Sequence, residues 1–430
     1  MAAIGILGAG LTGLTLGSLL EEAEIIEKEK TCGGLCRTIK EKGFYFDCCG
    51  SHIIFSKDKK ILRFMIEKLS GNVTRCRRNT KIFYKGHYVK YPFENNLSDL
   101  PLLENISCLL GLAKAKVKRN KNPKNFRDWI YQTFGNGIAE RYLIPYNEKI
   151  WKYDLAEMDI PWAEDRVPNP PFADVLKSSI GFRTEGYKHQ LNFYYPKKGG
   201  IQALIESLEK KCKDRVIKNF EVKKIYKKND KWCVSNGNEE RYYERIISTI
   251  PIFSTVGSMK NVPFKVREAL SKLKYNSLIT IMLGFDGNLN DFSWLYIPDQ
   301  KLLPHRIAFP SNYSKYVCPK GKSSAIVEIT YREGDFIDRM SDEKIINMVI
   351  NGLHRNKIID KRKIIFSKLK RTKFAYVIQD KEYKKNISLV RKFVESSGIS
   401  LLGRFAEFEY LNMDACVKRA IELGEKIKNE

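Results

Sequence analysis

The glycine pattern near the start of the chain limits the possible folds more than any other feature of the sequence. Gly8, Gly10 and Gly13 form a G-x-G-x-x-G pattern between the apolar run 3–7 and the apolar-periodic segment 11–20. In this pattern the first glycine permits a tight turn, and the second lets the backbone approach a pyrophosphate. The third glycine lets the helix pack closely on the strand. The pattern therefore predicts a strand, a glycine turn and a helix that together bind a dinucleotide.

An acidic residue after the next apolar run narrows the kind of dinucleotide. Residues 23–26 (AEII) form a second short apolar run, and Glu27 follows it directly. A carboxylate in this place accepts hydrogen bonds from both ribose hydroxyls and repels a 2′-phosphate, so NADP is disfavoured. The order of strand, glycine turn, helix, strand and acid between residues 3 and 27 predicts the first βαβ unit of a Rossmann-type fold.

A second glycine cluster follows Glu27 at a fixed distance. Gly33, Gly34 and Arg37 complete the stretch E-x5-GG-x2-R. This stretch resembles the extended fingerprint of FAD enzymes in the amine oxidase superfamily. In that superfamily the Gly-Gly pair lets the chain pass over the pyrophosphate, and the arginine helps to neutralise the pyrophosphate charge. The resemblance implies that the bound dinucleotide is FAD.

Four further segments resemble motifs of the same superfamily and occur in the same order. The superfamily motifs are Phe-Asp-x-x-Gly-x-His under the flavin, Pro-x-x-Gly-Gly before a helix, a strand and turn after the adenine region, and a C-terminal FAD motif. The matching segments are 43–55 (GFYFDCCGSHIIF), 194–208 (YYPKKGGIQALIESL), 245–251 (RIISTIP) and 401–427. Together with the first glycine cluster they span nearly the whole chain.

The C-terminal motif implies roles for four of its residues. By resemblance, Gly403 and Arg404 meet the pyrophosphate, whereas Asn412 and Met413 meet the flavin at the start of the last helix. A thioether to the flavin would need a cysteine placed differently from Cys416. We therefore expect FAD to bind tightly but without a covalent link.

The fold class expected from these motifs is α/β. A Rossmann-type FAD-binding domain carries an inserted α+β substrate domain, made of a mostly antiparallel sheet and helices. We expect the FAD-binding domain to comprise residues 1–58, 193–255 and 396–430. A mainly helical region at 59–192 and a β-rich region at 256–395 then form the substrate domain.

Hydrophobic periodicity gives a coarse expectation for individual elements. Alternation predicts strands, and a 3.6-residue period predicts helices. A hairpin is expected where Lys85-Gly86 separates two short runs. Strands are expected at 216–225, 241–248, 277–285, 294–297 and 324–331, helices at 59–69, 101–118, 125–142 and 341–354, the hairpin at 81–84 with 87–91, and a loop at 155–171.

The resemblance to the superfamily leaves two activities open. One is an FAD-dependent oxidoreductase of the amine oxidase or protoporphyrinogen oxidase-like type, in which the substrate transfers a hydride to flavin N5. The protein then has to hold the substrate C–H near the flavin and exclude water. His52 is the best candidate for a polar contact beside the flavin.

The alternative is a flavoenzyme similar to UDP-galactopyranose mutase, which isomerises a nucleotide- or lipid-linked sugar. Segments 50–55 (GSHIIF), 87–93 (HYVKYPF) and 146–151 (YNEKIW) are similar to segments of the mutases. Tyr410 falls on a tyrosine that touches substrate phosphate in the mutases. A diphosphate substrate also needs fork-shaped cationic partners.

The candidate diphosphate-binding arginines match the mutases only in part. Arg306 matches one of the two arginines that the mutases supply. Arg166 matches a neighbouring arginine, but the second clamp position falls on Pro170. Arg183 is a possible substitute. His52, Arg306 and Tyr410 are thus the candidate catalytic residues.

The charge and cysteine content bear on partners and location. The formal net charge of +26 comes from 76 Lys+Arg against 50 Asp+Glu, spread along the whole chain. No nucleic-acid-binding motif accompanies it, so we expect no specific nucleic acid. The positive charge suits a small anionic substrate and peripheral contact with an acidic membrane. A cytoplasmic location is expected because no apolar run is long enough to span a bilayer and no signal peptide is recognised. The spacing of Cys32, Cys36, Cys48 and Cys49 matches no common zinc pattern, so no metal site is predicted.

Overall fold

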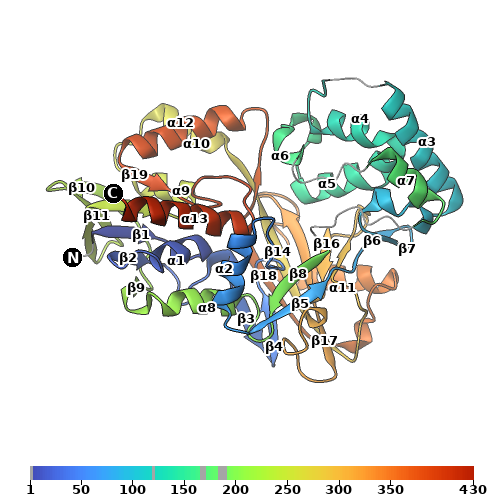
Figure 1. Ribbon diagram of the computed structural model, residues 1–430, viewed down its shortest axis with the longest axis horizontal. Coiled ribbons are helices and arrows are strands. Elements are labelled where there is room, and N and C mark those ends of the chain that lie inside the picture. The colour runs from blue at the N-terminus through green and yellow to red at the C-terminus, as the bar shows by residue number, and fades with distance from the viewer. Residues whose placement is uncertain (1–2, 119–121, 165–170, 183–190) are drawn as a thin grey trace.

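The computed structural model describes residues 3–118, 122–164, 171–182 and 191–430. It contains two large sheets, each covered on both faces, and a helical region at one end of the molecule (Figure 1). The two chain termini lie at the other end, beside the parallel sheet.

A five-stranded parallel sheet draws its strands from distant parts of the chain. Its order is β19 (Ile399–Leu401), β13 (Arg245–Ser248), β1 (Ile4–Leu7), β2 (Ala23–Ile26) and β9 (Val216–Ile217). All four neighbouring pairs are parallel, with Ile6 opposite Ile25 on one side and Ile247 on the other. The N-terminal, central and C-terminal segments therefore build one sheet together.

Successive side chains of the parallel sheet point to opposite faces, which gives it two hydrophobic cores. Ile6 and Ile25 belong to one core, and Leu7 and Ile26 belong to the other. The first core is closed by α1 (Leu11–Gly17), α2 (Lys59–Lys68), α8 (Gln202–Lys210) and α13 (Met413–Lys428). The second is closed by α9 (Ile252–Ser258), α10 (Phe264–Lys272), α12 (Tyr383–Ser396) and the small antiparallel sheet β10 (Lys224–Lys228), β11 (Lys231–Ser235) and β12 (Glu240–Tyr243).

A seven-stranded sheet forms the other half of the molecule. Its order is β18 (Ile364–Ile378), β14 (Lys274–Asp286), β17 (Lys322–Tyr331), β16 (Arg306–Ala308), β15 (Trp294–Tyr296), β6 (Thr80–Tyr84) and β7 (His87–Lys90). Every neighbouring pair is antiparallel except β15 and β6. Helix α11 (Asp342–Arg355) contributes to the core on one face. The other face packs on β3 (Thr38–Glu41), β4 (Phe44–Asp47), β5 (Val73–Arg77) and β8 (Asn192–Pro196).

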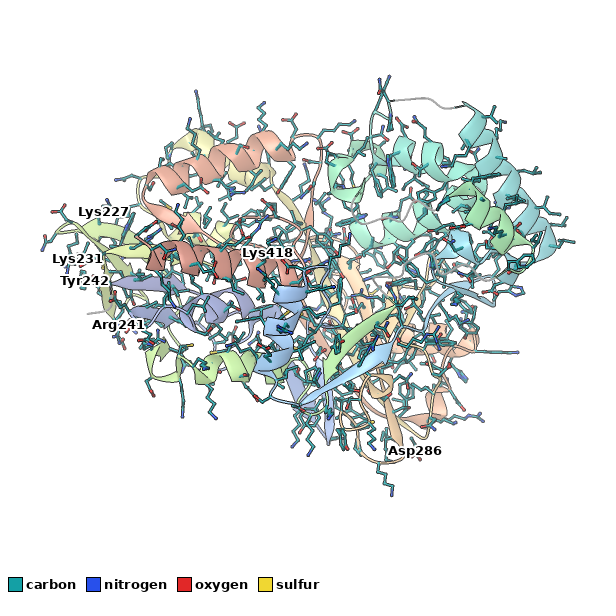
Figure 2. The ribbon with its side chains drawn as sticks, in the orientation of Figure 1. Lys227, Lys231, Arg241, Tyr242, Asp286 and Lys418 are labelled. Atoms are coloured by element: carbon teal, nitrogen blue, oxygen red, sulfur yellow. The ribbon has the colours of Figure 1, made fainter. Side chains whose placement is uncertain are left out.

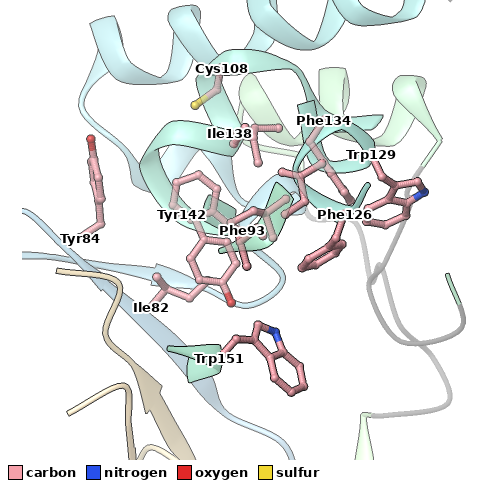
Figure 3. Close-up of a cluster of buried hydrophobic side chains, with 14 of the residues drawn as sticks. Ile82, Tyr84, Phe93, Cys108, Phe126, Trp129, Phe134, Ile138, Tyr142 and Trp151 are labelled. Atoms are coloured by element: carbon pink, nitrogen blue, oxygen red, sulfur yellow. The ribbon is translucent and has the colours of Figure 1, made fainter. Parts of the chain in front are cut away.

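The helical region packs around aromatic side chains beside β6 and β7. It comprises α3 (Leu102–Lys118), α4 (Phe126–Ile138), a π-helical turn Ala139–Leu143, α5 (Ile144–Trp151), α6 (Pro161–Glu164) and α7 (Phe172–Ser179). Figure 3 shows Phe93, Phe126 and Tyr142 from different elements gathered in this core. Phe93 and Tyr142 stack with ring centroids 5.2 Å apart, which fixes the helices on the hairpin.

These elements confirm the expected α/β fold class and the predicted hairpin, and they correct several local expectations. The segment 155–171 is predicted to be a loop, but its described residues contain a 3-10 turn at Leu155–Glu157 and α6, and residues 165–170 lie outside the described ranges. The single strand expected at 216–225 is two strands, β9 and β10, in different sheets. The strand expected at 241–248 is interrupted at Glu244, where the chain passes from the small sheet to the parallel sheet. The domain boundaries stay a prediction.

Charged side chains surround both halves of the molecule. Figure 2 shows Lys227, Lys231 and Arg241 on the small antiparallel sheet, and Asp286 at the far end of the seven-stranded sheet. Among the described residues, no helix has both the length and the apolar character needed to cross a membrane. No group of three or more His, Cys, Asp or Glu side chains in the described ranges could hold a metal ion. All ten cysteines are free thiols.

Candidate functional site

One large cavity begins at the carboxyl ends of β1 and β2 and extends to β15, β16, β18 and the helical region. Its volume is about 1280 Å³. A pocket for one small molecule is usually about 300–1,000 Å³, so this cavity has room for two ligands. Gly8 and Glu27 line its first part, whereas Tyr146, Arg306 and Tyr410 line its second part. In open parallel sheets, ligands bind beyond the carboxyl ends of the strands.

The glycine loops form an open cradle at the first part of the cavity. A Cβ added at Gly10 would meet no protein atom within 4 Å, because this residue faces the cavity. Gly34 has a φ of +55°, and its Cβ would lie 3.4 Å from the Cα of Gly10. Gly13 is not one of the described residues that line the cavity. A Cβ added there would lie 2.0 Å from the Gly8 carbonyl oxygen, so only glycine fits at this position. The sequence pattern thus brings backbone close to the space where a pyrophosphate would lie.

Glu27 lies at the cavity wall with its carboxylate held by the backbone. Its Oε2 accepts a hydrogen bond from the Ala9 N–H at 2.8 Å, and its Oε1 accepts one from the Glu29 N–H at 2.9 Å. A carboxylate has about four acceptor positions, so two remain for hydroxyl donors. The side chain is held in place and keeps the acceptor capacity expected for binding a ribose.

The two predicted pyrophosphate arginines have different surroundings. Arg37 lines the cavity, donates to the Gly34 carbonyl at 3.2 Å and lies 3.7 Å from Glu29. Arg404 donates to the Leu411 and Ala375 carbonyls, both at 2.6 Å. Its Nε is buried without a hydrogen-bond partner among the described residues. Arg404 therefore lines the cavity with a guanidinium that two backbone carbonyls hold in place.

Gly403 lies behind the cavity, because the described lining residues do not include it. Its φ is +99°, and an added Cβ would lie 2.6 Å from the Thr12 hydroxyl oxygen. Its N–H donates to Glu407 at 2.6 Å. This glycine lets β19 turn closely against α1, and its predicted contact with the pyrophosphate stays a prediction.

The N-terminus of α13 faces the cavity. Asn412 and Met413 both line it, and the extended Asn412 precedes the first helical turn without a side-chain cap. The first N–H groups of a helix have no partner within the helix, and they favour negative charge. Asp414 instead accepts a hydrogen bond from Ser56 at 2.7 Å.

His52 is neutral and fixed at the boundary between the two parts of the cavity. Its Nδ1 lies 2.8 Å from the Gly50 carbonyl oxygen. Because a carbonyl only accepts, Nδ1 carries the proton and Nε2 is an acceptor. Burial lowers the pKa of His52 to about 4, with smaller effects from Arg404 and Arg306.

Arg306 reaches the cavity from β16 and forms a two-pronged ion pair with Glu328. Its Nε and Nη2 donate to the two carboxylate oxygens at 3.0 and 2.6 Å. Glu328 is fully buried on β17, directly opposite Arg306 in the strand register. The ion pair as a whole has no net charge, and Glu328 holds the Arg306 guanidinium in place at the cavity. His305 is also fully buried, and burial lowers its pKa well below the usual range.

Aromatic side chains form the remaining wall of the second part. Tyr410 contacts Trp151 and Tyr376, with ring centroids 5.7 and 5.9 Å apart, and the Arg404 guanidinium lies 4.4 Å from its ring. Arg78 lies 4.5 Å from the Tyr91 ring and donates to the Tyr296 hydroxyl. The structure thus brings together the predicted His52, Arg306 and Tyr410 in one cavity.

The sequence did not reveal two residues of this wall, Tyr376 and Arg78, or Glu328, the buried partner of Arg306. Tyr376 comes from β18. This strand was not predicted, because its residues 368–373 are rich in lysine and arginine. Arg78 and Glu328 carry no local motif. The alternation at 324–331 predicted the strand that carries Glu328. An acid within such an apolar strand was the available sign that Glu328 has a buried cationic partner. Arg166, Pro170 and Arg183 lie outside the described residues.

Comparison with known proteins identifies the family. A family model described as flavin containing amine oxidoreductase matches residues 11–374. The chain belongs to this family of flavin-containing oxidoreductases, and the protein is a flavin-dependent enzyme.

Solved structures share the fold over the whole chain. A structure of reduced UDP-galactopyranose mutase superposes with a TM-score of 0.91 and 24% identity, covering 100% of this chain and 94% of that one. A proposed protoporphyrinogen oxidase from Exiguobacterium sp. 255-15 gives a TM-score of 0.74 at 16% identity, covering 99% and 98%. Both comparisons confirm the fold expected from the motifs.

One curated protein matches over a short stretch. The inactive all-trans-retinol 13,14-reductase of Danio rerio is 43% identical over 47 residues, which is 10% of this chain. The matched part is 8% of that protein's length.

Proposed function

We propose that the flavin of this enzyme is FAD and that it occupies the first part of the cavity. Glu27 accepts from the ribose hydroxyls, and the backbone at Gly10 and Gly34 approaches the pyrophosphate. Arg37 and Arg404 neutralise the pyrophosphate charge, and the start of α13 contacts the flavin. The open space at Gly10 and the two arginines that line the cavity support this assignment, because both suit a large anionic group.

We propose further that the substrate is a sugar linked to a nucleoside diphosphate and that the reaction is an isomerisation of the sugar. The observation that carries this proposal is the composition of the second part of the cavity. Arg78 and Arg306 approach it among the rings of Tyr146, Trp151 and Tyr410. Guanidinium groups bind phosphates in fork geometry, whereas a cationic amine substrate would be repelled by them. Aromatic rings provide stacking surfaces for a base.

The residues of the second part have separate tasks in this proposal. Arg306, held by Glu328, and Tyr410 bind the phosphates. Trp151 and Tyr146 pack on the base and exclude water. His52 offers an acceptor at Nε2 and, being neutral, adds no positive charge. The bound flavin supplies the chemistry at the sugar carbon.

The full-length likeness to UDP-galactopyranose mutase supports the same choice. The second candidate is hydride transfer from a small molecule to the flavin, and membership of the amine oxidoreductase family favours it. The two candidates differ in one measurable respect. An isomerase returns the flavin to its starting redox state after each turnover, whereas an oxidoreductase does not.

The test uses the flavin-loaded full chain under anaerobic conditions. Dithionite-reduced protein is incubated with UDP-galactopyranose, and the sugar products and the flavin absorbance are followed together. We expect ring contraction without net flavin oxidation. Bleaching of oxidised flavin by an amine or a porphyrinogen, without any sugar isomerisation, would overturn the proposal. Arg306→Lys should raise KM for the nucleotide sugar, and Arg362→Lys, which changes an exposed arginine that is not among the described cavity-lining residues, serves as the control.

We propose that the protein also makes peripheral contact with anionic membranes through the outer face of α3 and α7. In Figure 1 these helices lie at the end of the molecule far from the parallel sheet. Leu103 and Val117 on α3 are 81% and 86% exposed, and Ile180 after α7 is 69% exposed. Exposed Lys114 and Lys116 follow on the same helix. An apolar stripe beside lysines is complementary to an acidic lipid surface.

Sedimentation with lipid vesicles tests this contact. The protein should bind vesicles containing phosphatidylglycerol and not pure phosphatidylcholine. Leu103→Glu with Leu110→Glu should abolish binding, whereas Phe264→Glu, which changes an equally exposed residue on α10, should not. Self-association that the same pair of changes abolishes, without vesicle binding, would show that a second copy covers this face instead.

A cytoplasmic location is proposed from the ten free thiols.

A further inference from the structure

Two consecutive cysteines lie at the wall of the cavity without a role in the proposed function. Cys48 and Cys49 follow β4, and their Sγ atoms are 3.8 Å apart. Cys48 is fully buried, whereas Cys49 is 9% exposed and lines the cavity. Cys49 is therefore the member of the pair that a small molecule in the cavity can reach.

Strand β18 supplies polar partners to both sulfur atoms. The Lys370 ammonium donates to Cys48 Sγ at 3.0 Å, and the Thr372 hydroxyl donates to Cys49 Sγ at 3.4 Å. A hydrogen bond from an ammonium or a hydroxyl stabilises a thiolate more than a thiol. The pair therefore has an environment suited to one negative charge, with a proton source beside it.

Cys49, the sulfur that lines the cavity, is the one whose pKa is lowered. The hydrogen bond from Cys48 lowers the pKa of Cys49 to about 6, and Lys370, Thr372 and Arg37 act in the same direction against burial. The pKa of Cys48 is raised, because its proton is held in that hydrogen bond and because it is buried. Cys36 and Cys416 line the same cavity, but burial raises the pKa of each.

We propose that Cys48 and Cys49 form a redox-active dithiol that reduces hydrogen peroxide, with Cys49 as the attacking residue and Cys48 as the resolving residue. The structural basis is the adjacent sulfur pair at the cavity wall, held by Lys370 and Thr372. This inference goes beyond the proposed isomerisation and does not depend on it.

In the first step the Cys49 thiolate attacks one peroxide oxygen. The S–O bond forms, the O–O bond breaks, and the leaving hydroxide takes a proton from Lys370 to become water. Cys49 is now a sulfenic acid, oxidised by two electrons, and the peroxide has been reduced by two electrons.

In the second step the neutral Lys370 amine takes the proton of Cys48. The Cys48 thiolate attacks the Cys49 sulfur, so that the S–S bond forms and the S–O bond breaks. The hydroxide released takes the proton back from Lys370 and leaves as water, and Lys370 is reprotonated from solvent. The balance is two thiols and one peroxide giving one disulfide and two waters.

The first test measures which thiol of the cavity reacts. Full-length flavin-loaded protein is treated with a limiting amount of iodoacetamide near pH 7, and the labelled peptides are quantified by mass spectrometry. Cys49 should be labelled at least about tenfold faster than Cys36 or Cys416, because a larger thiolate fraction outweighs its lower nucleophilicity. Equal labelling of the three, or labelling of Cys48 first, would overturn the assignment.

The second test measures the product with peroxide. One equivalent of hydrogen peroxide should remove two hydrogen atoms from the intact mass and join Cys48 to Cys49. In Cys48→Ser the sulfenic acid should persist and react with dimedone. An unchanged mass, or a disulfide between other cysteines, would refute the dithiol.

Two lysine variants test whether Lys370 takes part in the chemistry of Cys49. Lys370→Met should slow both alkylation and oxidation of Cys49 by roughly tenfold, since the neighbouring positive charge is lost. Lys368→Met is the matched control on the same strand, because Lys368 pairs with Glu41 at 2.8 Å instead. Equal rates in the two variants would remove Lys370 from the mechanism. Thermal melting of each variant shows that it is folded, and the measurements on the unmodified chain do not depend on any variant.

Discussion

Replacing Glu328 with glutamine tests whether the cavity is built to receive negative charge. Glu328 accepts both prongs of Arg306 and also accepts the Ser51 N–H at 3.3 Å. Glutamine keeps the size and one acceptor oxygen but removes the charge that balances Arg306. The Arg306 side chain is 22% exposed, so it cannot recover full hydration.

The expected cost follows from this geometry. Removing one partner of a buried ion pair destabilises a protein by about 3–5 kcal/mol. Because Arg306 reaches the cavity, we expect the lower end, about 3 kcal/mol. An unfolding entropy of about 2.1 cal/mol/K per residue gives roughly 0.9 kcal/mol/K for this chain, so Tm should fall by about 3 °C. The freed charge should in turn tighten uridine diphosphate binding about tenfold, which is about 1.4 kcal/mol.

Calorimetric melting without ligand and titration with uridine diphosphate measure the two effects. Asp380→Asn is the matched control, because Asp380 is a buried acid that pairs with Lys274 and is not among the described cavity-lining residues. It should lower Tm similarly and leave the affinity for uridine diphosphate unchanged. If Glu328→Gln melted like the unmodified protein and bound the nucleotide equally well, the assignment of Arg306 as an anion-binding group would be wrong.

Three further changes test other parts of the cavity. Gly10→Ala should fold normally but weaken FAD binding at least about tenfold by equilibrium dialysis, whereas Gly257→Ala, whose Cβ also meets open space, should bind FAD normally. The pKa of His52 is lowered to about 4, so the unfolded state binds more protons between about pH 4 and 6.5. Stability should therefore rise as pH increases through that window, by up to about 1.36 kcal/mol per pH unit, and His52→Gln should remove this slope in urea unfolding; an unchanged slope contradicts the neutral imidazole. Burial lowers the pKa of Lys149 to about 7, so stability should rise between about pH 7 and 10.5, and Lys149→Met should flatten that rise; a rise that persists in this variant assigns it to another group.

The parts of the fold that follow from local chemistry were predictable from the sequence. The turn at Gly8–Gly13 needs glycines at fixed positions, because each either faces the ligand space or contacts backbone closely. Glu27 follows from the length of one βαβ unit. His52 follows from a motif within a few residues. Such features leave a signal wherever they occur in a chain.

Features that depend on strand register left no comparable signal. Arg306 and Glu328 are 22 residues apart and meet because β16 and β17 pair in one register. Strand β18 carries four lysine and arginine side chains between residues 368 and 373. These charges hide the alternation that identifies a half-buried strand. Tyr376, at its buried end, could therefore not be placed beside Tyr410 before the sheet order was known.

The strand order of the parallel sheet also determines when the protein can fold during its synthesis. Strand β19 closes one edge, and α13, which ends at Lys428, packs on α1 near the start of the chain. A ribosome that has made the glycine loops has therefore not yet made the last strand and helix that cover them. N-terminal segments expose apolar surface as long as the strand and helix that pack on them have not been synthesised. The nascent chain should thus acquire its cofactor only after β19 and α13 have been made and have packed on the sheet.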